Sequence, residues 1–221
     1  MARITRKYIS KKSFVFHILN RGNAKQEVFH EAEDFKYFWN LLKKYQIKFG
    51  FKLYHWVLMN NHFHLEMELP DSNLLSKIMA GISRAYVHYH HAKYDSAGYL
   101  WQGRFKSQPI QKGNYLLQCG RYIERNPLRA GIVDFPWLYQ WSSCKFYSSG
   151  IEDDITNHNP YFNKFLKNTD QGRIQYRKWI LESDNLEFRG ATRPVGDEVF
   201  LKSLLVRGSR FVAPRRGRKV S

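Results

Sequence analysis

Two histidines two residues apart, His62 and His64, lie within an alternating apolar run from Trp56 to Leu69. Alternation of this kind predicts a β-strand, on which residues two apart share a face. Both imidazoles would then point the same way, and two imidazoles on a rigid strand can bind one divalent cation. A cation bound there can polarise a phosphoryl oxygen. The alternative is a pair of ordinary histidines on a half-exposed strand.

Two acids, Glu66 and Glu68, follow on the same predicted face as the histidines. The intervening positions are apolar and are expected to face a core: Phe63, Leu65, Met67 and Leu69. The pattern therefore predicts a strand with one face in the core and one face available for chemistry.

A second group of polar side chains falls on a predicted helix over residues 114–126. Tyr122 and Asn126 are four residues apart, so they share one face of that helix. Tyr122 is a candidate nucleophile, and the amide oxygen of Asn126 is a candidate ligand for a hard cation. Tyr115, two turns earlier, is the competing nucleophile. The surrounding arginines would attract a phosphate backbone: Arg121, Arg125 and Arg129.

Seven elements must position these side chains. Periodicity and turn residues predict strands at 14–19, 51–59, 62–69 and 100–111, and helices at 31–48, 74–93 and 114–126. The first six elements form the βαββαβ order of a ferredoxin-like fold, an α+β antiparallel sheet with helices on one side. The seventh is an added catalytic helix that is free to pack near the polar face of the sheet.

Beyond this frame the periodic pattern weakens. We predict a catalytic domain over residues 1–136 and a mainly helical C-terminal extension, packed on it, over residues 137–206. The last short helix of that extension is expected at 194–205. Residues 207–221 form a basic tail that we expect to be mobile.

The amino-acid composition indicates which class of partner the protein binds. The 221 residues carry a formal net charge of +17, which makes a polyanion, and above all nucleic acid, the expected partner. Only two cysteines occur, which excludes a disulfide scaffold. No apolar run reaches the roughly 20 residues of a membrane helix. We therefore expect a cytoplasmic, nucleoid-associated protein with no membrane partner.

Basic side chains along the whole chain are candidate contacts to a DNA backbone: Arg3, Arg6, Arg21, Arg104, Lys106, Arg121, Arg125 and Arg129. Three aromatic residues, Tyr99, Trp101 and Phe105, are candidate platforms on which unpaired bases stack. The alternative for each of these rings is a place in the core.

Five segments of the sequence, in order and in register, resemble the REP-associated tyrosine transposases, relatives of the Y1 single-strand transposases of the HUH class. They span roughly residues 14–148: Asn20–Asn23 with Val28 and Phe29, Trp56–Leu65, Leu100–Phe105, Arg121–Gly131 and Trp141–Ser143. Asn60 stands where that family usually has a proline.

Carried over position by position, the resemblance implies that His62 and His64 bind a metal ion, Mg²⁺ or Mn²⁺. It implies Asn126 as the third ligand and Tyr122 as the nucleophile. The implied intermediate is a covalent 5′-phosphotyrosine with a free 3′ hydroxyl, so the phosphodiester energy is retained and no ATP is needed. Glu66 is not implied as a ligand, and we interpret it as at most a neighbour of the metal site.

The resemblance also implies the substrate, a DNA hairpin with an adjoining single-stranded tetranucleotide, as in REP and BIME elements. The expected activity is metal-dependent nicking and strand transfer on single-stranded or hairpin DNA by a monomer, with a homodimer as the alternative. Two other functions stay open. One is a catalytically silent binder of DNA or RNA hairpins, and the other is an RNA-processing nuclease on the same frame.

Overall fold

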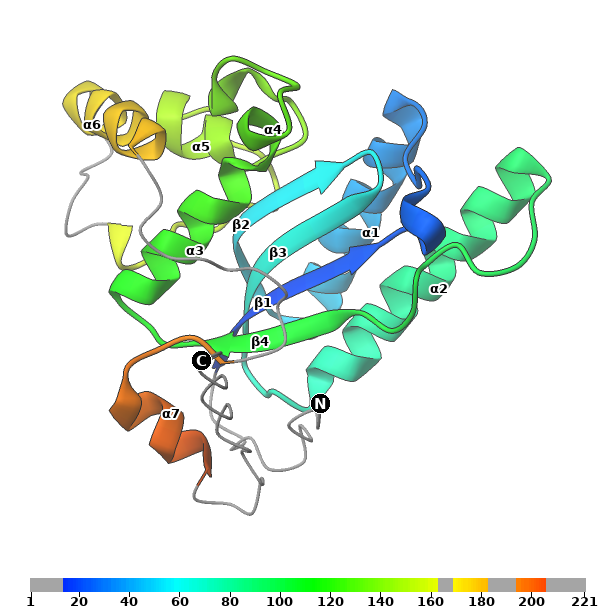
Figure 1. Ribbon diagram of the computed structural model, residues 1–221, viewed down its shortest axis with the longest axis horizontal. Coiled ribbons are helices and arrows are strands. Elements are labelled where there is room, and N and C mark those ends of the chain that lie inside the picture. The colour runs from blue at the N-terminus through cyan, green and yellow to red at the C-terminus, as the bar shows by residue number, and fades with distance from the viewer. Residues whose placement is uncertain (1–13, 163–168, 183–193, 206–221) are drawn as a thin grey trace, which may run out of the picture.

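One four-stranded antiparallel sheet, in the order β2-β3-β1-β4, forms the centre of the protein (Figure 1). The computed structural model describes residues 14–162, 169–182 and 194–205. The strands are β1 (Phe14–Arg21), β2 (Lys52–Met59), β3 (His62–Leu69) and β4 (Lys106–Ile110). Together with two helices in the predicted places, these strands confirm the α+β, ferredoxin-like class.

The two faces of the sheet separate apolar from polar side chains, as alternation predicted. On β3, the residues Phe63, Leu65, Met67 and Leu69 lie in the main core. His62, His64 and Glu66 therefore point to the opposite face. Since β3 is paired with β1 on one side and β2 on the other, this row of polar side chains runs through the middle of the sheet.

Two long helices, α1 (Ala32–Phe49) and α2 (Leu74–Tyr94), cover the apolar face (Figure 1). A short 3-10 turn, η2 (Asn23–Lys25), follows β1. Gly50 ends α1 with φ 64°, a left-handed conformation that glycine adopts without steric cost. The helix predicted over 31–48 is confirmed, with its end one residue later.

Asp34 anchors the start of α1. Its Oδ2 accepts hydrogen bonds from the backbone N–H groups of His30 (2.8 Å) and Glu31 (3.1 Å) and from the hydroxyl of Tyr94 (2.7 Å). Lys93 donates to Oδ1 at 3.1 Å. Burial alone would raise the pKa of Asp34, but these hydrogen bonds lower it from 3.8 to about 2.

A pKa below the unfolded value means that the ionised Asp34 stabilises the folded state above pH 3.8 and that this contribution is lost as the pH falls toward 2. We expect Asp34→Asn to lower the free energy of unfolding by about 2 kcal/mol at neutral pH. The difference should shrink as the pH falls below about 4. Urea denaturation of both proteins across this range measures it, and a difference that does not change with pH would contradict the assignment.

The opposite face of the sheet is covered by α3 (Asn114–Glu124), followed directly by α4 (Asn126–Arg129). The predicted single helix over 114–126 is thus wrong at its end, because the chain turns at Arg125 and starts a second short helix. Pro127 lies in the first turn of α4, where its missing N–H group breaks no hydrogen bond. Leu116, Cys119 and Ile123 of α3 pack against the sheet.

The predicted strand over residues 100–111 is wrong in its first half. Only Lys106–Ile110 pairs with β1 as β4, whereas Trp101 makes one isolated bridge with Gly22. The segment before β4 is irregular because Leu100 and Trp101 bury their side chains in the main core.

The C-terminal extension is mainly helical, as predicted. Within the ranges that the structure describes it contains η3 (Pro136–Leu138), α5 (Cys144–Ser149), α6 (Asp170–Leu181) and α7 (Glu198–Leu205). Leu117 of α3 shares a small core with Tyr176 and Ile180 of α6. The predicted basic tail at 207–221 lies outside the described residues.

Across the part of the chain that the structure describes, no helix has both the length and the apolar character that crossing a membrane requires.

Candidate active site

The two histidines of the apolar run lie side by side on β3, on the face that α3 covers. The ring centroids of His62 and His64 are 5.1 Å apart. His64 is 5% exposed, whereas His62 is half-buried at the end of the strand. The two imidazoles thus share one face of β3, as the alternation predicted.

Each imidazole of this pair is oriented by a neighbour at Nδ1. The His62 Nδ1 lies 2.6 Å from Oδ1 of Asn61, and the His64 Nδ1 lies 2.8 Å from Nε2 of His17. A ring held at one nitrogen presents the other nitrogen in a defined direction, which is a common arrangement of metal-binding histidines. His17 on β1 is a residue that sequence reasoning left unassigned, since nothing local distinguishes it from other strand histidines.

Burial keeps these histidines neutral. It lowers the pKa of His17 to about 3 and, together with the charge of Arg21, lowers the pKa of His62 to about 4. The pKa of His64 also lies well below its usual range, again mainly through burial. Neutral imidazoles carry the lone pair that a metal ion requires, so all three rings are in the right ionisation state at pH 7.

Tyr122 of α3 faces this pair. Its ring centroid lies 5.7 Å from that of His64 and 6.0 Å from that of His17, in both cases edge to face. The guanidinium of Arg129 lies over the Tyr122 ring, 5.0 Å from the centroid. The competing Tyr115 packs against the apolar cluster between α3 and the sheet.

Asn126 connects α4 to the histidine pair. Its Nδ2 donates to the backbone carbonyls of Tyr122 (2.9 Å) and Ile123 (3.0 Å). Asn126 also shares a side-chain hydrogen bond with His62, so its amide group lies beside the imidazole pair. The residue predicted as the third ligand therefore lies next to His62.

These donors fit a divalent cation with one amide oxygen and two imidazole nitrogens as protein ligands. Within residues 14–162, 169–182 and 194–205, no cluster of three or more His, Cys, Asp and Glu side chains is arranged for a metal ion. Asn126 as the third ligand stays a prediction.

Glu66 is fully buried beneath α3, and neither of its carboxyl oxygens has a nitrogen or oxygen partner. Burial raises its pKa well above the usual range, against a smaller opposite effect of the neighbouring Cys119 thiol. Glu66 lies on the same face of β3 as the two histidines, as predicted. Glu68 instead bonds to Tyr54 and Lys112.

A buried hydrogen-bond network around Glu124 holds α3 in place. Its Oε1 accepts from His55 Nδ1 (2.8 Å) and from the Ser143 hydroxyl (2.6 Å), and its Oε2 accepts from the Tyr176 hydroxyl. Gly120 lets the helix approach closely, because a Cβ there would lie 2.3 Å from the His55 ring. His55 is thus a buried, hydrogen-bonded histidine of the sheet.

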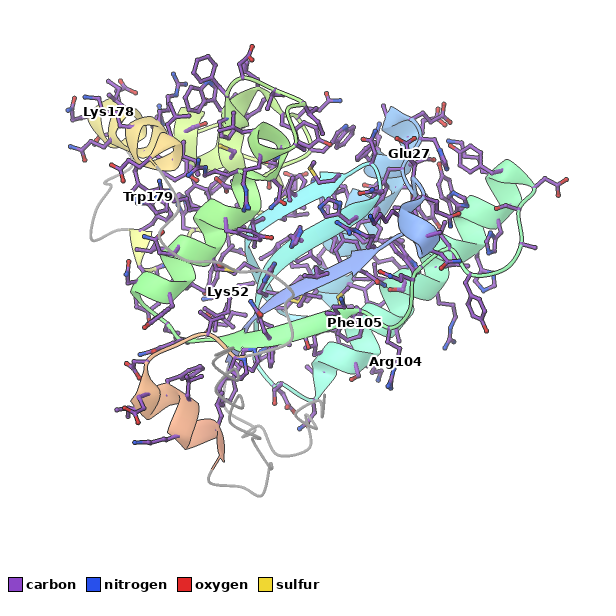
Figure 2. The ribbon with its side chains drawn as sticks, in the orientation of Figure 1. Glu27, Lys52, Arg104, Phe105, Lys178 and Trp179 are labelled. Carbon is purple, nitrogen blue, oxygen red and sulfur yellow. The ribbon has the colours of Figure 1, made fainter. Side chains whose placement is uncertain are left out.

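The predicted DNA contacts separate into several groups. Arg104 and Lys106 are exposed near the start of β4, as Figure 2 shows for Arg104, and Arg129 is exposed beside Tyr122. Arg21 pairs across the sheet with His62 at the edge of the site. Arg3 and Arg6 lie outside the described residues.

The prediction that Arg121 contacts DNA is wrong, because this side chain is buried. It is 2% exposed, its guanidinium lies 5.2 Å from the ring of Trp179 on α6, and it donates to the backbone carbonyl of Glu182. Arg125 donates to the same carbonyl while remaining half-buried. The burial of Arg121 makes it a link between α3 and the extension.

The three aromatic candidates for base stacking also differ. Trp101 is 8% exposed and contacts Phe38 and Phe63 in the core, and Phe105 packs against the same cluster. Tyr99 is 86% exposed. Of the three, only Tyr99 presents a ring that an unpaired base could reach.

Comparisons with known proteins bear on the family and the fold of this chain. The family described as "Transposase IS200 like" matches residues 10–126, more than half of the chain. The solved structure described as "Structure of the REP associates tyrosine transposase bound to a REP hairpin" is similar to this chain with a TM-score of 0.56 and 19% sequence identity, over 71% of this chain and 92% of that one. Comparison with curated proteins finds no match. The extent of the family match shows that this chain belongs to the IS200-like transposase family.

Proposed function

We propose that this protein is a metal-dependent endonuclease and strand transferase of single-stranded or hairpin DNA that acts through a covalent 5′-phosphotyrosine. The observation that carries the proposal is the position of Tyr122, whose ring centroid lies 5.7 Å from that of His64 in an edge-to-face arrangement. His62 is the neighbour of His64 on β3, and Asn126 is hydrogen-bonded to His62. The side chains of a tyrosine, two neutral histidines and an asparagine thus lie together, contributed by α3, β3 and α4.

His62, His64 and Asn126 would hold the cofactor, Mg²⁺ or Mn²⁺. When bound, such an ion withdraws electron density from the scissile phosphate and offsets the charge that develops during displacement. Asn61 and His17 hold the two imidazoles in position at their Nδ1 atoms. Little reorganisation is then needed when the site is loaded.

The covalent step uses the hydroxyl of Tyr122. Its oxygen attacks the phosphorus atom and loses its proton to water, a bond forms between Oη and phosphorus, and the bond from phosphorus to the 3′ oxygen breaks. That oxygen takes up a proton and leaves as a 3′ hydroxyl. Arg129 over the ring favours the developing phenolate electrostatically. Attack by a 3′ hydroxyl on the phosphotyrosine reverses the step and joins strands.

The proposed substrate is a REP-like DNA hairpin with a single-stranded flank, which is the specificity of the REP-associated group. A net charge of +17 and the exposed Arg104, Lys106 and Arg129 support a phosphate backbone as partner. The solved relative of similar fold is bound to a REP hairpin. All site residues belong to one chain, which supports a monomer that completes its site without a partner.

The deciding experiment incubates the protein with a labelled hairpin oligonucleotide and Mn²⁺ or Mg²⁺, followed by denaturing electrophoresis. We expect a metal-dependent, denaturant-resistant adduct with the 5′ phosphate of the cleaved strand. Hairpin binding with no adduct under any metal condition would favour the silent binder. Hydrolysed RNA with no protein-bound strand would favour the RNA-processing nuclease.

Asn126→Ala tests the third ligand. Removing the amide oxygen should raise the Mn²⁺ concentration required for half-maximal adduct formation by about tenfold, the usual lower range for a lost metal contact. Titration of adduct yield against Mn²⁺ measures this. An unchanged requirement would show that water or another residue is the third ligand.

A further inference from the structure

Three buried polar side chains form a chain across the sheet toward the proposed metal site. Nε2 of Gln108 on β4 lies 3.1 Å from Nδ1 of His17 on β1, and Nε2 of His17 lies 2.8 Å from Nδ1 of His64 on β3. Their exposed fractions are 3%, 0% and 5%. Gln108 and His17 are directly paired in the β1–β4 register.

Such a chain restricts where protons can lie. In a neutral imidazole one ring nitrogen donates and the other accepts, so each hydrogen bond in the chain determines the direction of the next. The group at the far end, the amide of Gln108, therefore determines which nitrogen of His64 carries the proton.

Two arrangements satisfy all the hydrogen bonds. When the Gln108 nitrogen donates to His17 Nδ1, His17 donates from Nε2 to His64, and the proton of His64 lies on Nε2. A half-turn of the amide brings its oxygen to His17, and every donor and acceptor reverses. His64 then donates from Nδ1 and carries a lone pair on Nε2, the form that binds a metal ion.

We propose that Gln108 and His17 are positioning residues that set the tautomer of His64, and that metal binding selects the arrangement in which the Gln108 oxygen faces His17. This inference rests on the proposed role of His64 as a metal ligand. The proposed role gives a reason for burying three polar side chains together on β4, β1 and β3. Apolar side chains at these positions would need no hydrogen-bond partners.

The test compares His17→Leu with His17→Gln. Leucine removes the acceptor for the His64 Nδ1 proton, whereas the glutamine oxygen can replace it. We expect His17→Leu to weaken the binding of Mn²⁺ alone by about tenfold or more, as for other outer partners of metal ligands, and His17→Gln to restore most of the affinity. Isothermal titration calorimetry without DNA measures both.

A second readout addresses the tautomer itself. In ¹⁵N-labelled protein with Mg²⁺, the two ring nitrogens of His64 should show one dominant tautomer with the proton on Nδ1, and His17→Leu should give a mixture. Gln108→Leu, which leaves His17 in place, should shift the populations in the same direction and provides a second variant should His17→Leu not fold. His90→Gln, a buried histidine on α2, is the matched control and should change neither readout.

Wild-type Mn²⁺ affinity in His17→Leu, with an unchanged His64 tautomer, would overturn the inference even if the wild-type protein forms the DNA adduct. Conversely, His17→Leu could lose Mn²⁺ affinity while the wild-type protein never forms an adduct. That result would support the control of the His64 tautomer by His17 and refute the strand-transfer function. A wild-type protein that binds no Mn²⁺ would overturn both.

Discussion

Tyr122→Phe is expected to abolish the covalent adduct completely while leaving hairpin binding within about twofold of the wild-type affinity. The substitution removes only the hydroxyl oxygen, which is the atom that would attack phosphorus. The phenyl ring can keep its edge-to-face contacts with His17 and His64 and its place beneath Arg129. Adduct yield on a denaturing gel and hairpin affinity by fluorescence anisotropy measure the two properties separately.

Tyr115→Phe is the matched control for this variant. It makes the same chemical change on the same helix, at a tyrosine that packs in the apolar cluster between α3 and the sheet. We expect it to retain adduct formation. If instead the adduct persisted in Tyr122→Phe and disappeared in Tyr115→Phe, the nucleophile would be Tyr115.

Glu124→Ala is expected to cause the largest loss of stability, about 3–5 kcal/mol in the free energy of unfolding. The carboxylate is fully buried and accepts hydrogen bonds from His55, Ser143 and Tyr176. Its removal leaves these three buried groups without their shared partner, and a buried polar group without a hydrogen bond is costly. Urea denaturation followed by circular dichroism measures the loss.

We expect the loss of the Glu124 network to displace Tyr122 as well, because the two residues are two positions apart on α3. Adduct formation by Glu124→Ala should therefore fall together with stability. Glu198→Ala, at an exposed acid on α7 that pairs with Lys202 at the surface, is the control and should unfold like the wild type. A Glu124→Ala protein as stable as the wild type would show that the network does not hold the helix.

Local sequence patterns were sufficient for most of the frame. The alternation from Trp56 to Leu69 correctly predicted that His62 and His64 share a face opposite the core. The helix predicted over 31–48 ends at Phe49, one residue later. Such predictions succeed because side-chain periodicity and backbone preferences act between residues close in the sequence. The roles of Tyr122, Asn126 and the metal ion remain predictions with a geometry that suits them.

Other features had no local signal. The partner of His64 is His17, 47 residues earlier, and the carboxylate that satisfies His55 comes from Glu124, 69 residues later. The sequence predicted Arg121 as a DNA contact, but α6 buries its guanidinium against Trp179. The segment before β4 is not part of the sheet, because the side chain of Trp101 packs in the main core.

The sequence by itself determined the element order, the faces of the strands and the residue types available for chemistry. Only the tertiary structure decided which buried polar groups meet, because burial forces every donor and acceptor to find a partner among residues brought together by strand pairing and helix packing. That requirement produced the chain from Gln108 through His17 to His64 and the network around Glu124. Neither is encoded in any short segment of the chain.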